Sequence, residues 1–528
     1  SQSSPSLTLE KGAYRMHAPA PRRSPSKLRR GHVPRDVWTA PEKQMALIVL
    51  LLVLATLTCF GAAYYLLVTR WEHKVLQAEV SASDSHESLH LEVVPFEPDD
   101  LDGSSIHPDT KFLSYLPHSG FHNQRIAFEN ALVLARILNR TLLVPPVRLA
   151  KANGTSGYMP FDALLNYTIH AGKQDLIHCA SFSSYATLPT ECVNYFDYTL
   201  VSWDWIVDLD SIRAEQDILE RWDFHDEWIQ QHLHISEDET LILKDDNAYH
   251  YRFVDLHPQK SLGPRYLESI SISELNKHPH RLLQIGTLFG SSRLRLRDSW
   301  NVAIRTDVRE KMVFANPLFH EITDAVQLSL GGAYLAAHVR VGDGHFTTNA
   351  RENVRVIWQR LVHNSLGFST NDLANNSILE DESILPSNFA GLDALLPELS
   401  PSSRKRTNTH LRCQRPPHTD PHLIPLNIPL FISTDAPEPS AHEALRLFYD
   451  TFPCTFTLSD VPEQLALLDN LQSGYDGLML RDFAIPFLDA MVAAKADDVV
   501  GTEGSTFSQF VEDVLWMQYH GWDIVQRG

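Results

Sequence analysis

The sequence predicts an α/β protein with two Rossmann-like domains behind a single N-terminal transmembrane helix. A strand–helix–strand pattern begins at residue 111, and a second set of buried strands and helices lies between residues 333 and 515. Parallel strands joined by a helix are the repeating unit of such sheets. Because the long segment 147–325 separates the two patterns, we expect two doubly wound domains and not one sheet.

The first pattern opens a predicted N-terminal domain, 111–325. Residues 111–117 and 141–146 are short apolar runs typical of buried strands, and prolines end the second run. Residues 124–139 carry apolar side chains at helical spacing, which predicts an amphipathic helix. The residues before it, 119–123, are expected to form a loop.

The second pattern defines a predicted C-terminal domain, 326–528. Its main elements are buried strands at 333–341, 429–435 and 497–501, with helices at 440–450, at 480–495 and after Ser505. The segment 366–425 is rich in Ser, Asn, Pro and charge, which indicates a long irregular insertion within this domain.

Composition narrows the classes of function. Hydrophobic residues make up 43% of the 528 residues and charged residues 21%, which is ordinary for a globular protein and excludes a wholly disordered chain. The formal net charge is -20. A nucleic-acid-binding chain is expected to show a basic face, so we expect no nucleic-acid partner.

The N-terminal region divides into three segments of different charge. Residues 1–44 hold nine Lys or Arg and three acidic residues, and their Ser and Pro content predicts a disordered basic tail. Residues 45–68 contain no charge, and a helix of that length is long enough to cross a bilayer. Residues 69–110 are acidic and read as a stalk.

This charge asymmetry predicts the topology. Lys and Arg gather on the cytosolic side of membrane spans, so the tail is expected in the cytosol and the rest of the chain in a lumen. The expectation is a single-pass type II membrane protein of the Golgi or endoplasmic reticulum, with a signal-anchor and the lipid bilayer as partner of residues 45–68.

Cysteines and glycosylation sequons agree with a lumen. Four cysteines lie beyond the membrane segment, and Cys179–Cys192 with Cys413–Cys454 is the simplest of three possible disulfide connectivities. Zinc binding is the alternative, but no C-x2-C spacing supports it. Asn-x-Ser/Thr sequons also occur at Asn139, Asn153, Asn166 and Asn375.

The strand at 333–341 carries the first candidate site. Side chains alternate along a strand, so His338 and Arg340 share a face near its carboxyl end. That end of an open α/β sheet borders the ligand crevice, and Arg suits bidentate binding of phosphate. The alternative is an edge strand with a solvated Arg and a hydrogen-bonded His.

Two further segments join a strand to a helix. In 501–510 (GTEGSTFSQF), glycines and hydroxyl side chains at a helix start suit a phosphate, although Ser505 serves equally as a simple helix cap. No Lys follows the glycines, so a P-loop is unsupported. In Gly120 to Arg125, polar residues at a helix start face a cleft or merely cap the helix.

A metal site is not expected. Asp208-Leu-Asp210 resembles the Asp-x-Asp that holds Mn²⁺ in metal-dependent glycosyltransferases, but the same tripeptide occurs at 100–102 in the stalk. The 26 histidines show no ligand spacing typical of a zinc hydrolase.

In this order, four blocks resemble the GDP-fucose protein O-fucosyltransferase-like family. They are Gly120-Phe-His-Asn-Gln-Arg125 followed by a helix and LNRTLLVPP, His338-Val-Arg340-Val-Gly-Asp343, Phe431-Ile-Ser-Thr-Asp435, and Gly501-Thr-Glu-Gly-Ser-Thr-Phe-Ser508. The resemblance covers roughly 111–528. It implies a GT-B arrangement of two Rossmann-like domains, with 111–325 on the acceptor side and 326–528 binding the donor.

The resemblance also implies an activity, inverting transfer of L-fucose from GDP-fucose to a protein or glycan hydroxyl, with no required metal. Arg340 would bind the diphosphate and stabilise the charge on the leaving group, which suits the chemistry. Asn123 would lie near fucose and acceptor. The remaining residues would be His338, Asp343, Asp489 at the guanine, Ser505, Thr506 and Phe507 on the donor side, with Gly120 and Gln124 in the acceptor-side loop.

Several points stay open at this stage. The general base is unassigned, because Glu129 is placed well inside the first helix. The acceptor is not inferable from 147–325 or 366–425. The alternatives are a GT-B transferase using another nucleotide sugar, and a catalytically silent luminal binding protein on the same scaffold.

Overall fold

The computed structural model describes residues 92–94, 96, 106–151, 157–182, 188–256, 265–290, 292–342, 344–368 and 411–526. The predicted tail 1–44, the membrane segment 45–68 and most of the stalk 69–110 lie outside these ranges. No helix within the described ranges is long and apolar enough to cross a membrane.

The first sheet has five parallel strands in the order β6-β3-β2-β10-β7. Along that order they are Ile218–Glu220, Thr141–Val144, Phe112–Tyr115, Leu282–Ile285 and Thr240–Leu243. The three central strands are buried along their whole length, as expected for a parallel sheet with both faces covered. The strand–helix–strand pattern predicted at residue 111 is therefore present.

The second sheet has four parallel strands in the order β14-β13-β12-β16. They are Thr455–Phe456, Leu430–Thr434, Leu335–Val339 and Asp498–Gly501. The three strands predicted from sequence are all present, and β12 lies between two partners. Two separate parallel sheets confirm the mixed α/β fold, while the boundary between 325 and 326 stays a prediction.

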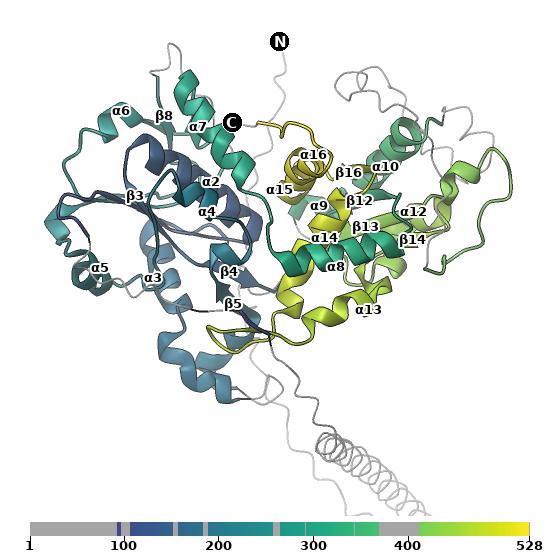
Figure 1. Ribbon diagram of the computed structural model, residues 1–528, viewed down its shortest axis with the longest axis horizontal. Helices are drawn as coiled ribbons and strands as arrows, with labels where there is room; N and C mark the ends of the chain where they lie inside the picture. Colours follow the sequence, from purple (N-terminus) through teal and green to yellow (C-terminus); the bar gives the residue numbers. More distant parts are fainter. Residues whose placement is uncertain are drawn as a thin grey trace, which may run out of the picture. The chain divides into compact units, whose positions relative to one another are not determined.

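Helices cover both sheets. The longer ones are α2 (Phe121–Ile137), α3 (Phe161–Ala171), α5 (Asp226–Leu233), α7 (Ser299–Lys311), α8 (Pro317–Ser329), α10 (Ala350–Arg360) and α14 (Arg481–Ala494). Helix α2 packs on β2 and β3 with α7 beside it, and α8 packs along α14 (Figure 1). The shorter ones are α4 (Asp210–Arg213), α6 (Ile272–Leu275), α9 (Gly344–Thr348), α12 (Arg446–Thr451) and α13 (Pro462–Leu465).

Smaller sheets complete the fold. Strands β8 (Tyr251–Val254), β9 (Glu268–Ser271) and β11 (Leu294–Arg295) form a parallel sheet in the order β11-β8-β9. Strands β4 (Val147–Ala150) and β5 (Tyr198–Val201) pair antiparallel, and β1 (Glu92–Val94) pairs in parallel with β15 (Leu471–Ser473). These short strands explain why the sequence of 147–325 showed little periodicity.

Helix α2 begins earlier than predicted. Residues 119–123 were expected to form a loop, but the backbone N–H groups of Asn123 and Gln124 donate to the Gly120 carbonyl at 3.0 and 3.2 Å. Gly120 is extended and precedes the first turn. Phe121 stabilises this turn because its ring packs against the rings of Trp203, Phe314 and Phe487. The expectation of a loop at 121–123 was therefore wrong.

The helix predicted at 440–450 is shorter in the structure. Two 3-10 turns, Pro439–Ala441 and Glu443–Leu445, precede α12, and His442 between them is extended. Pro439 opens the first turn because its ring fixes a helical φ and needs no hydrogen bond from its nitrogen. Only the last part of the predicted helix is therefore α-helical.

The end of the predicted insertion is anchored to the second sheet. Within 366–425, residues 369–410 lie outside the described ranges. From 411 onward the chain is irregular, as expected, but it is fixed by a disulfide between Cys413 and Cys454. The Arg415 N–H also donates to the Pro453 carbonyl at 3.2 Å.

The last helical run is continuous from Thr506 to Tyr519. It comprises α15 (Thr506–Phe510), the π-helical turn Val511–Trp516 and α16 (Met517–Tyr519). A π-turn inserts an extra residue and shifts the faces of the helix on either side of it. The α15 portion packs against α2, which brings the C-terminal sheet's last helix to the start of the first sheet's main helix.

Candidate active site

Polar residues gather where the strands of the second sheet end. In the register of this sheet, His338 of β12 lies opposite Ser433 of β13 and Gly501 of β16. Arg340 follows β12 directly, and Asp435 follows β13. Carboxyl ends of parallel strands border the ligand crevice of α/β sheets. Because β12 has a partner on each side, the alternative of an edge strand with a solvated Arg is excluded.

The backbone around Arg340 is fixed from two sides. Its N–H donates to Thr502 Oγ1 at 3.0 Å, and Thr502 bonds in turn to the His338 carbonyl through its N–H and its hydroxyl. On the other side, the N–H groups of Val341 and Gly342 donate to the Asp435 carboxylate at 2.7 and 3.1 Å. These bonds hold the loop after β12 in one position.

The Arg340 guanidinium is half-buried beside an aromatic ring. Its Cζ lies 4.6 Å from the centroid of Phe346, in the short helix α9 that follows the loop. Cation–π contact restrains the side chain without neutralising its charge. Asp343, the other predicted residue of this block, lies outside the described residues.

His338 joins the sheet to the last helix. The imidazole stacks on the Phe507 ring with 4.3 Å between centroids and 19° between planes, and its Nδ1 bonds to Ser508 Oγ at 2.6 Å. Burial, and then the charge of Arg340, lower the pKa of His338 to about 3. The ring is therefore neutral at physiological pH, and the positive charge of this edge resides on Arg340.

The loop between β16 and α15 brings the helix start against the strand end. A Cβ on Gly501 would lie 2.4 Å from the Cβ of Ser508, so only glycine allows this approach. Ser505 is fully buried and its hydroxyl accepts from the Ser508 N–H at 3.4 Å, so it caps α15. Thr506 and Phe507 are half-buried. Of the three predicted donor-side residues in this segment, Ser505, Thr506 and Phe507, the last two have exposed surface.

Sequence reasoning overlooked His122. Its ring packs edge-on against Phe507 at 4.6 Å and lies 5.3 Å from the Phe510 ring. Its Nδ1 is buried and has no hydrogen-bond partner. Burial lowers the pKa of His122 well below its usual range, and the charges of Arg125, His338 and Arg340 add to that effect. The sequence offers one indication of this role, because His122 stands next to Asn123 within the Gly120 to Arg125 block. Its contact with the last helix is evident only in the structure.

The other predicted residues of the first block have different roles. Asn123 is half-buried in the first turn of α2. Gln124 is buried, and its amide donates to the carbonyls of Ser119 and Arg148 and accepts from the Arg148 N–H. Gln124 therefore joins α2 to β4 through backbone bonds, a role that depends on a contact distant in sequence. Gly120 is the residue before the helix.

A small cavity of about 30 Å³ lies at the carboxyl ends of the first sheet. Its lining includes His118, Gln124, Arg148, Tyr167 and Trp222. Both ring nitrogens of His118 are bonded, to Ser119 Oγ and Thr287 Oγ1 at 2.7 Å each. Burial lowers the pKa of His118 to about 4, so this ring is neutral as well.

Asp489 lies in α14, which packs on β12 and β13. Burial raises the pKa of its carboxyl to about 7, and the nearby Ser433 hydroxyl partly offsets the rise. A carboxyl group that titrates near neutral pH beside a candidate site is a feature of binding and catalytic positions.

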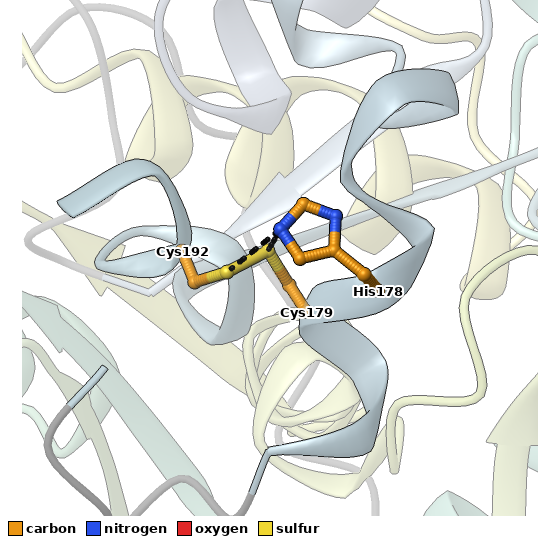
Figure 2. A group of neighbouring side chains, drawn as sticks. All are labelled: His178, Cys179 and Cys192. Carbon is orange, nitrogen blue, oxygen red and sulfur yellow. Dashed lines mark hydrogen bonds between the residues drawn. A yellow bond between two sulfur atoms is a disulfide. The ribbon is translucent and has the colours of Figure 1, made fainter. Parts of the chain in front are cut away.

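Both predicted disulfides are present. Cys179 and Cys192 are bonded, as are Cys413 and Cys454. Figure 2 shows the His178 ring above the first bond, with Nε2 at 3.6 and 3.7 Å from the two sulfurs. These three residues lie within metal-ligand distances, but their sulfurs are already joined to each other.

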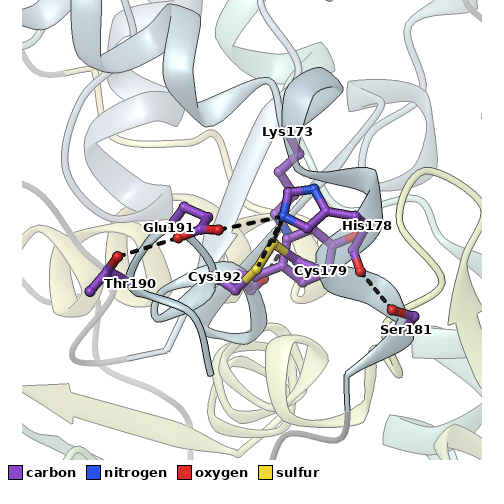
Figure 3. The surroundings of a disulfide bond; sticks show 8 residues. Lys173, His178, Cys179, Ser181, Thr190, Glu191 and Cys192 are labelled. Atoms are coloured by element: carbon purple, nitrogen blue, oxygen red, sulfur yellow. Dashed lines mark hydrogen bonds and ion pairs between the residues drawn. A yellow bond between two sulfur atoms is a disulfide. The ribbon is translucent and has the colours of Figure 1, made fainter. Parts of the chain in front are cut away.

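The surroundings of this disulfide are held by ionic contacts. His178 Nε2 also lies 3.9 Å from Glu191 Oε1. Figure 3 shows this contact as a dashed line between Glu191 and His178, on the side of the ring away from Ser181. Lys173, nearby, forms a buried ion pair with Asp476 and donates to the carbonyls of Tyr195 and Tyr198. These bonds join the disulfide segment to the turn after β15, which indicates a structural role.

Asp208 and Asp210 form a turn. Asp208 Oδ1 accepts from the Asp210 N–H at 3.0 Å, both residues are exposed, and helix α4 begins at Asp210. The Asp-x-Asp tripeptide here stabilises the start of a helix, which is a common use of aspartate.

Residues 112–355 match the protein-family model described as GDP-fucose protein O-fucosyltransferase. This range carries the block from Gly120 to Arg125 and the block with His338 and Arg340. Residues 112–355 are therefore similar to O-fucosyltransferases. The matched range ends before Asp435, Asp489 and the 501–508 loop. Asp435 and the loop follow β13 and β16, the two strands that pair with β12. Asp489 lies in α14, which packs on β12 and β13.

Individual known proteins align with different shares of the chain. O-fucosyltransferase 30 of Arabidopsis thaliana is 65% identical over 37 residues, which span only 7% of this chain and 7% of that relative. Crystal structures of POFUT1 in complex with GDP and in apo form are each 10% identical with a TM-score of 0.33. They cover 77% and 80% of this chain, and 94% and 99% of their own chains.

Proposed function

We propose that this chain transfers L-fucose from GDP-fucose to a hydroxyl group of a protein or glycan acceptor. The observation that carries the proposal is Arg340, a cation held at the carboxyl end of a central strand by bonds through Thr502 and Asp435. The match of residues 112–355 to the GDP-fucose protein O-fucosyltransferase model supports GDP-fucose as the donor whose diphosphate Arg340 would bind.

Arg340 would act on the leaving group. When the bond between fucose and the diphosphate breaks, negative charge develops on the departing phosphate oxygens, and a preorganised guanidinium stabilises that charge. The backbone N–H groups at the start of the helical run 506–519 add a positive end beside it. Together these groups would supply the positive charge that a metal provides elsewhere, so we propose that no metal is required.

The transfer would invert the anomeric centre. The acceptor hydroxyl attacks the anomeric carbon from the face opposite the diphosphate, the new C–O bond forms as the bond to the phosphate oxygen breaks, and the hydroxyl loses its proton. We assign Asn123, in the first turn of α2, to contact fucose and acceptor. The general base stays unassigned.

His122 supports a ligand between α2 and α15. A buried ring nitrogen without a partner loses its hydration without compensation. The donor carries both acceptor oxygens and hydroxyl groups, so it would satisfy a neutral imidazole in either tautomer. We propose that His122 Nδ1 bonds to the donor when it is bound. The position of His122 against Phe507 supports this assignment.

We also propose the topology of a type II membrane protein, with residues 45–68 as signal-anchor and the catalytic part in the lumen of the Golgi or endoplasmic reticulum. The basic tail before this segment and the acidic stalk after it support the orientation. Two disulfides agree with an oxidising compartment.

Thermal shift of the full chain in detergent tests the donor class. A ligand that binds the folded state raises the melting temperature by mass action. GDP is expected to raise it more than UDP or CMP, and Arg340→Ala is expected to abolish the GDP shift. Arg351→Ala is the matched control. Arg351 is also an arginine, but it lies on α10, which packs against β12, and its side chain is exposed. A larger shift with UDP would point to another nucleotide sugar, and no shift with any nucleotide would favour a silent binding protein.

A further inference from the structure

A second cavity lies behind the candidate donor site, where α2, α7 and the last helical run meet. It measures about 40 Å³. Its polar lining includes Arg125, Glu129, Arg305, Arg309, Thr506 and Asp513. Neither Arg340 nor His338 lines it, and Thr506 is the predicted donor-side residue that it shares with the site described above.

The buried Glu129 carboxylate contacts two arginines of the cavity lining. Glu129 accepts from Arg125 Nη1 at 3.0 Å on one oxygen, and Arg309 Nε lies 2.9 Å from the other. Arg125 also stacks on Phe510, with its Cζ 4.3 Å from the ring centroid. All three charged side chains are at least nine-tenths buried. Glu129 therefore compensates at most one of the two positive charges.

Arg305 adds a third positive charge. Only 8% of this residue is exposed, and its Nε and Nη1 are buried without a hydrogen-bond partner. Within the described residues no carboxylate lies at ion-pair distance from it. Burying an unpaired charge costs several kcal/mol in real proteins. Asp513 is the second acid on the lining.

The size of the cavity limits what it holds. A water molecule needs about 10 to 15 Å³ of such volume, so this cavity has room for roughly three waters. A nucleotide is far too large for it. A tetrahedral oxyanion is of the right size, and guanidinium groups bind such ions through paired N–H donors.

We propose that this cavity binds a compact oxyanion, phosphate or sulfate, through Arg305 with Arg125 and Arg309 around it. The ion would satisfy the two buried N–H groups of Arg305 and lie against the guanidinium groups around it. Burial lowers the pKa of both Arg125 and Arg305. The charge of Arg309 adds to this effect at each, and the charge of Glu129 opposes it. An anion would reverse that effect.

The ion would connect three helices. Arg125 belongs to α2, Arg305 to α7, and Thr506 begins the helical run that carries Phe507. An oxyanion in this cavity therefore stabilises the packing of α15 on α2. The ligand class follows from charge and volume alone and does not depend on the fucose transfer proposed above.

Thermal shift and calorimetric titration of the full chain with inorganic phosphate test this proposal, with potassium chloride holding ionic strength constant. Wild type and Arg340→Ala are both expected to show a saturable rise in melting temperature. Arg305→Met is expected to show none. Without phosphate, Arg305→Met is expected to be at least as stable as wild type, because it removes a buried unpaired charge.

Arg305→Lys keeps the charge but loses the paired donors, so it is expected to bind phosphate more weakly than wild type. Parallel titrations with sulfate distinguish the two ions, since one of them is expected to bind more tightly. An equal shift in wild type and Arg305→Met would overturn the proposal. Loss of the shift in Arg340→Ala but not in Arg305→Met would also overturn it, because the ion would then occupy the donor site.

Discussion

The imidazole of His338 stacks on the ring of Phe507, with 4.3 Å between centroids and 19° between planes. The first residue lies near the end of β12 and the second in the first turn of α15, 169 residues later in the chain. This contact places the start of α15 directly over the carboxyl end of β12, beside Arg340. The start of the Thr506–Tyr519 run therefore lies at the same end of the sheet as Arg340.

Loss of the Phe507 ring is expected to weaken GDP binding. Phe507→Ala removes the stacking partner of His338 and the edge contact of His122, so the helix start loses its fixed position. Phe507→Tyr keeps the ring and is expected to bind GDP like wild type. Calorimetric titration with GDP measures both, and equal affinity of the Ala variant and wild type would contradict the positioning role.

The Thr502 hydroxyl is expected to hold the backbone of Arg340. Thr502→Val keeps the shape but leaves the Arg340 N–H without its acceptor, which costs about 1 to 3 kcal/mol for a buried donor. Thr502→Ser keeps the hydroxyl and is expected to cost less. Chemical denaturation measures the free energy of unfolding of each variant. Equal stability of the two variants would show that the bond from the Arg340 N–H to the Thr502 hydroxyl does not contribute.

GDP binding is expected to depend on the protonation of Asp489. Burial raises the pKa of this carboxyl to about 7, and a guanine held by Asp489 needs the ionised form to accept its N–H donors. As pH falls below 7 the carboxyl gains a proton, so affinity for GDP is expected to fall by up to about tenfold per pH unit. The fall is expected to disappear in Asp489→Asn. An identical pH profile in the variant would remove Asp489 from the guanine site.

Acid is expected to destabilise the fold partly through His338. The pKa of His338 is about 3 in the folded protein, against 6.5 for an unperturbed histidine side chain. Below pH 6.5 the unfolded chain binds a proton that the folded ring does not, so stability falls as pH falls through this window. Between pH 6.5 and 5 the loss is about 2 kcal/mol. Replacing the ring by Gln should flatten the measured slope of unfolding free energy against pH by nearly one proton.

The strands around the site were predictable because each contains a short, mainly apolar run. Residues 335–339, 430–434 and 498–501 are buried almost throughout, and such runs read as strands of a parallel sheet. His338 and Arg340 were predictable for the same reason, since alternation along a strand sets where each side chain emerges. Cysteine pairing followed from the even count and the simplest spacing.

Other features depend on contacts that no local pattern records. Asp435 bonds to the N–H groups of Val341 and Gly342 across two strands, and Gln124 bonds to Arg148 in a different element. The cavity beside Arg305 forms only when α2, α7 and α15 pack together, so no local sequence pattern indicates it. His122 lies in a segment that reads as a loop, and its orphaned nitrogen is visible only once Phe507 is placed beside it.

The rate at which the full chain releases GDP from GDP-fucose tests the proposed role of Arg340 most directly. Wild type and Arg351→Ala are expected to release GDP at the same rate, and Arg340→Ala to be slower by about a hundredfold or more, as when a group that stabilises transition-state charge is removed. Arg340→Lys keeps a charge without the paired donors and is expected to lie between them. An Arg340→Ala variant with the wild-type rate would contradict the central claim that this guanidinium stabilises the departing diphosphate.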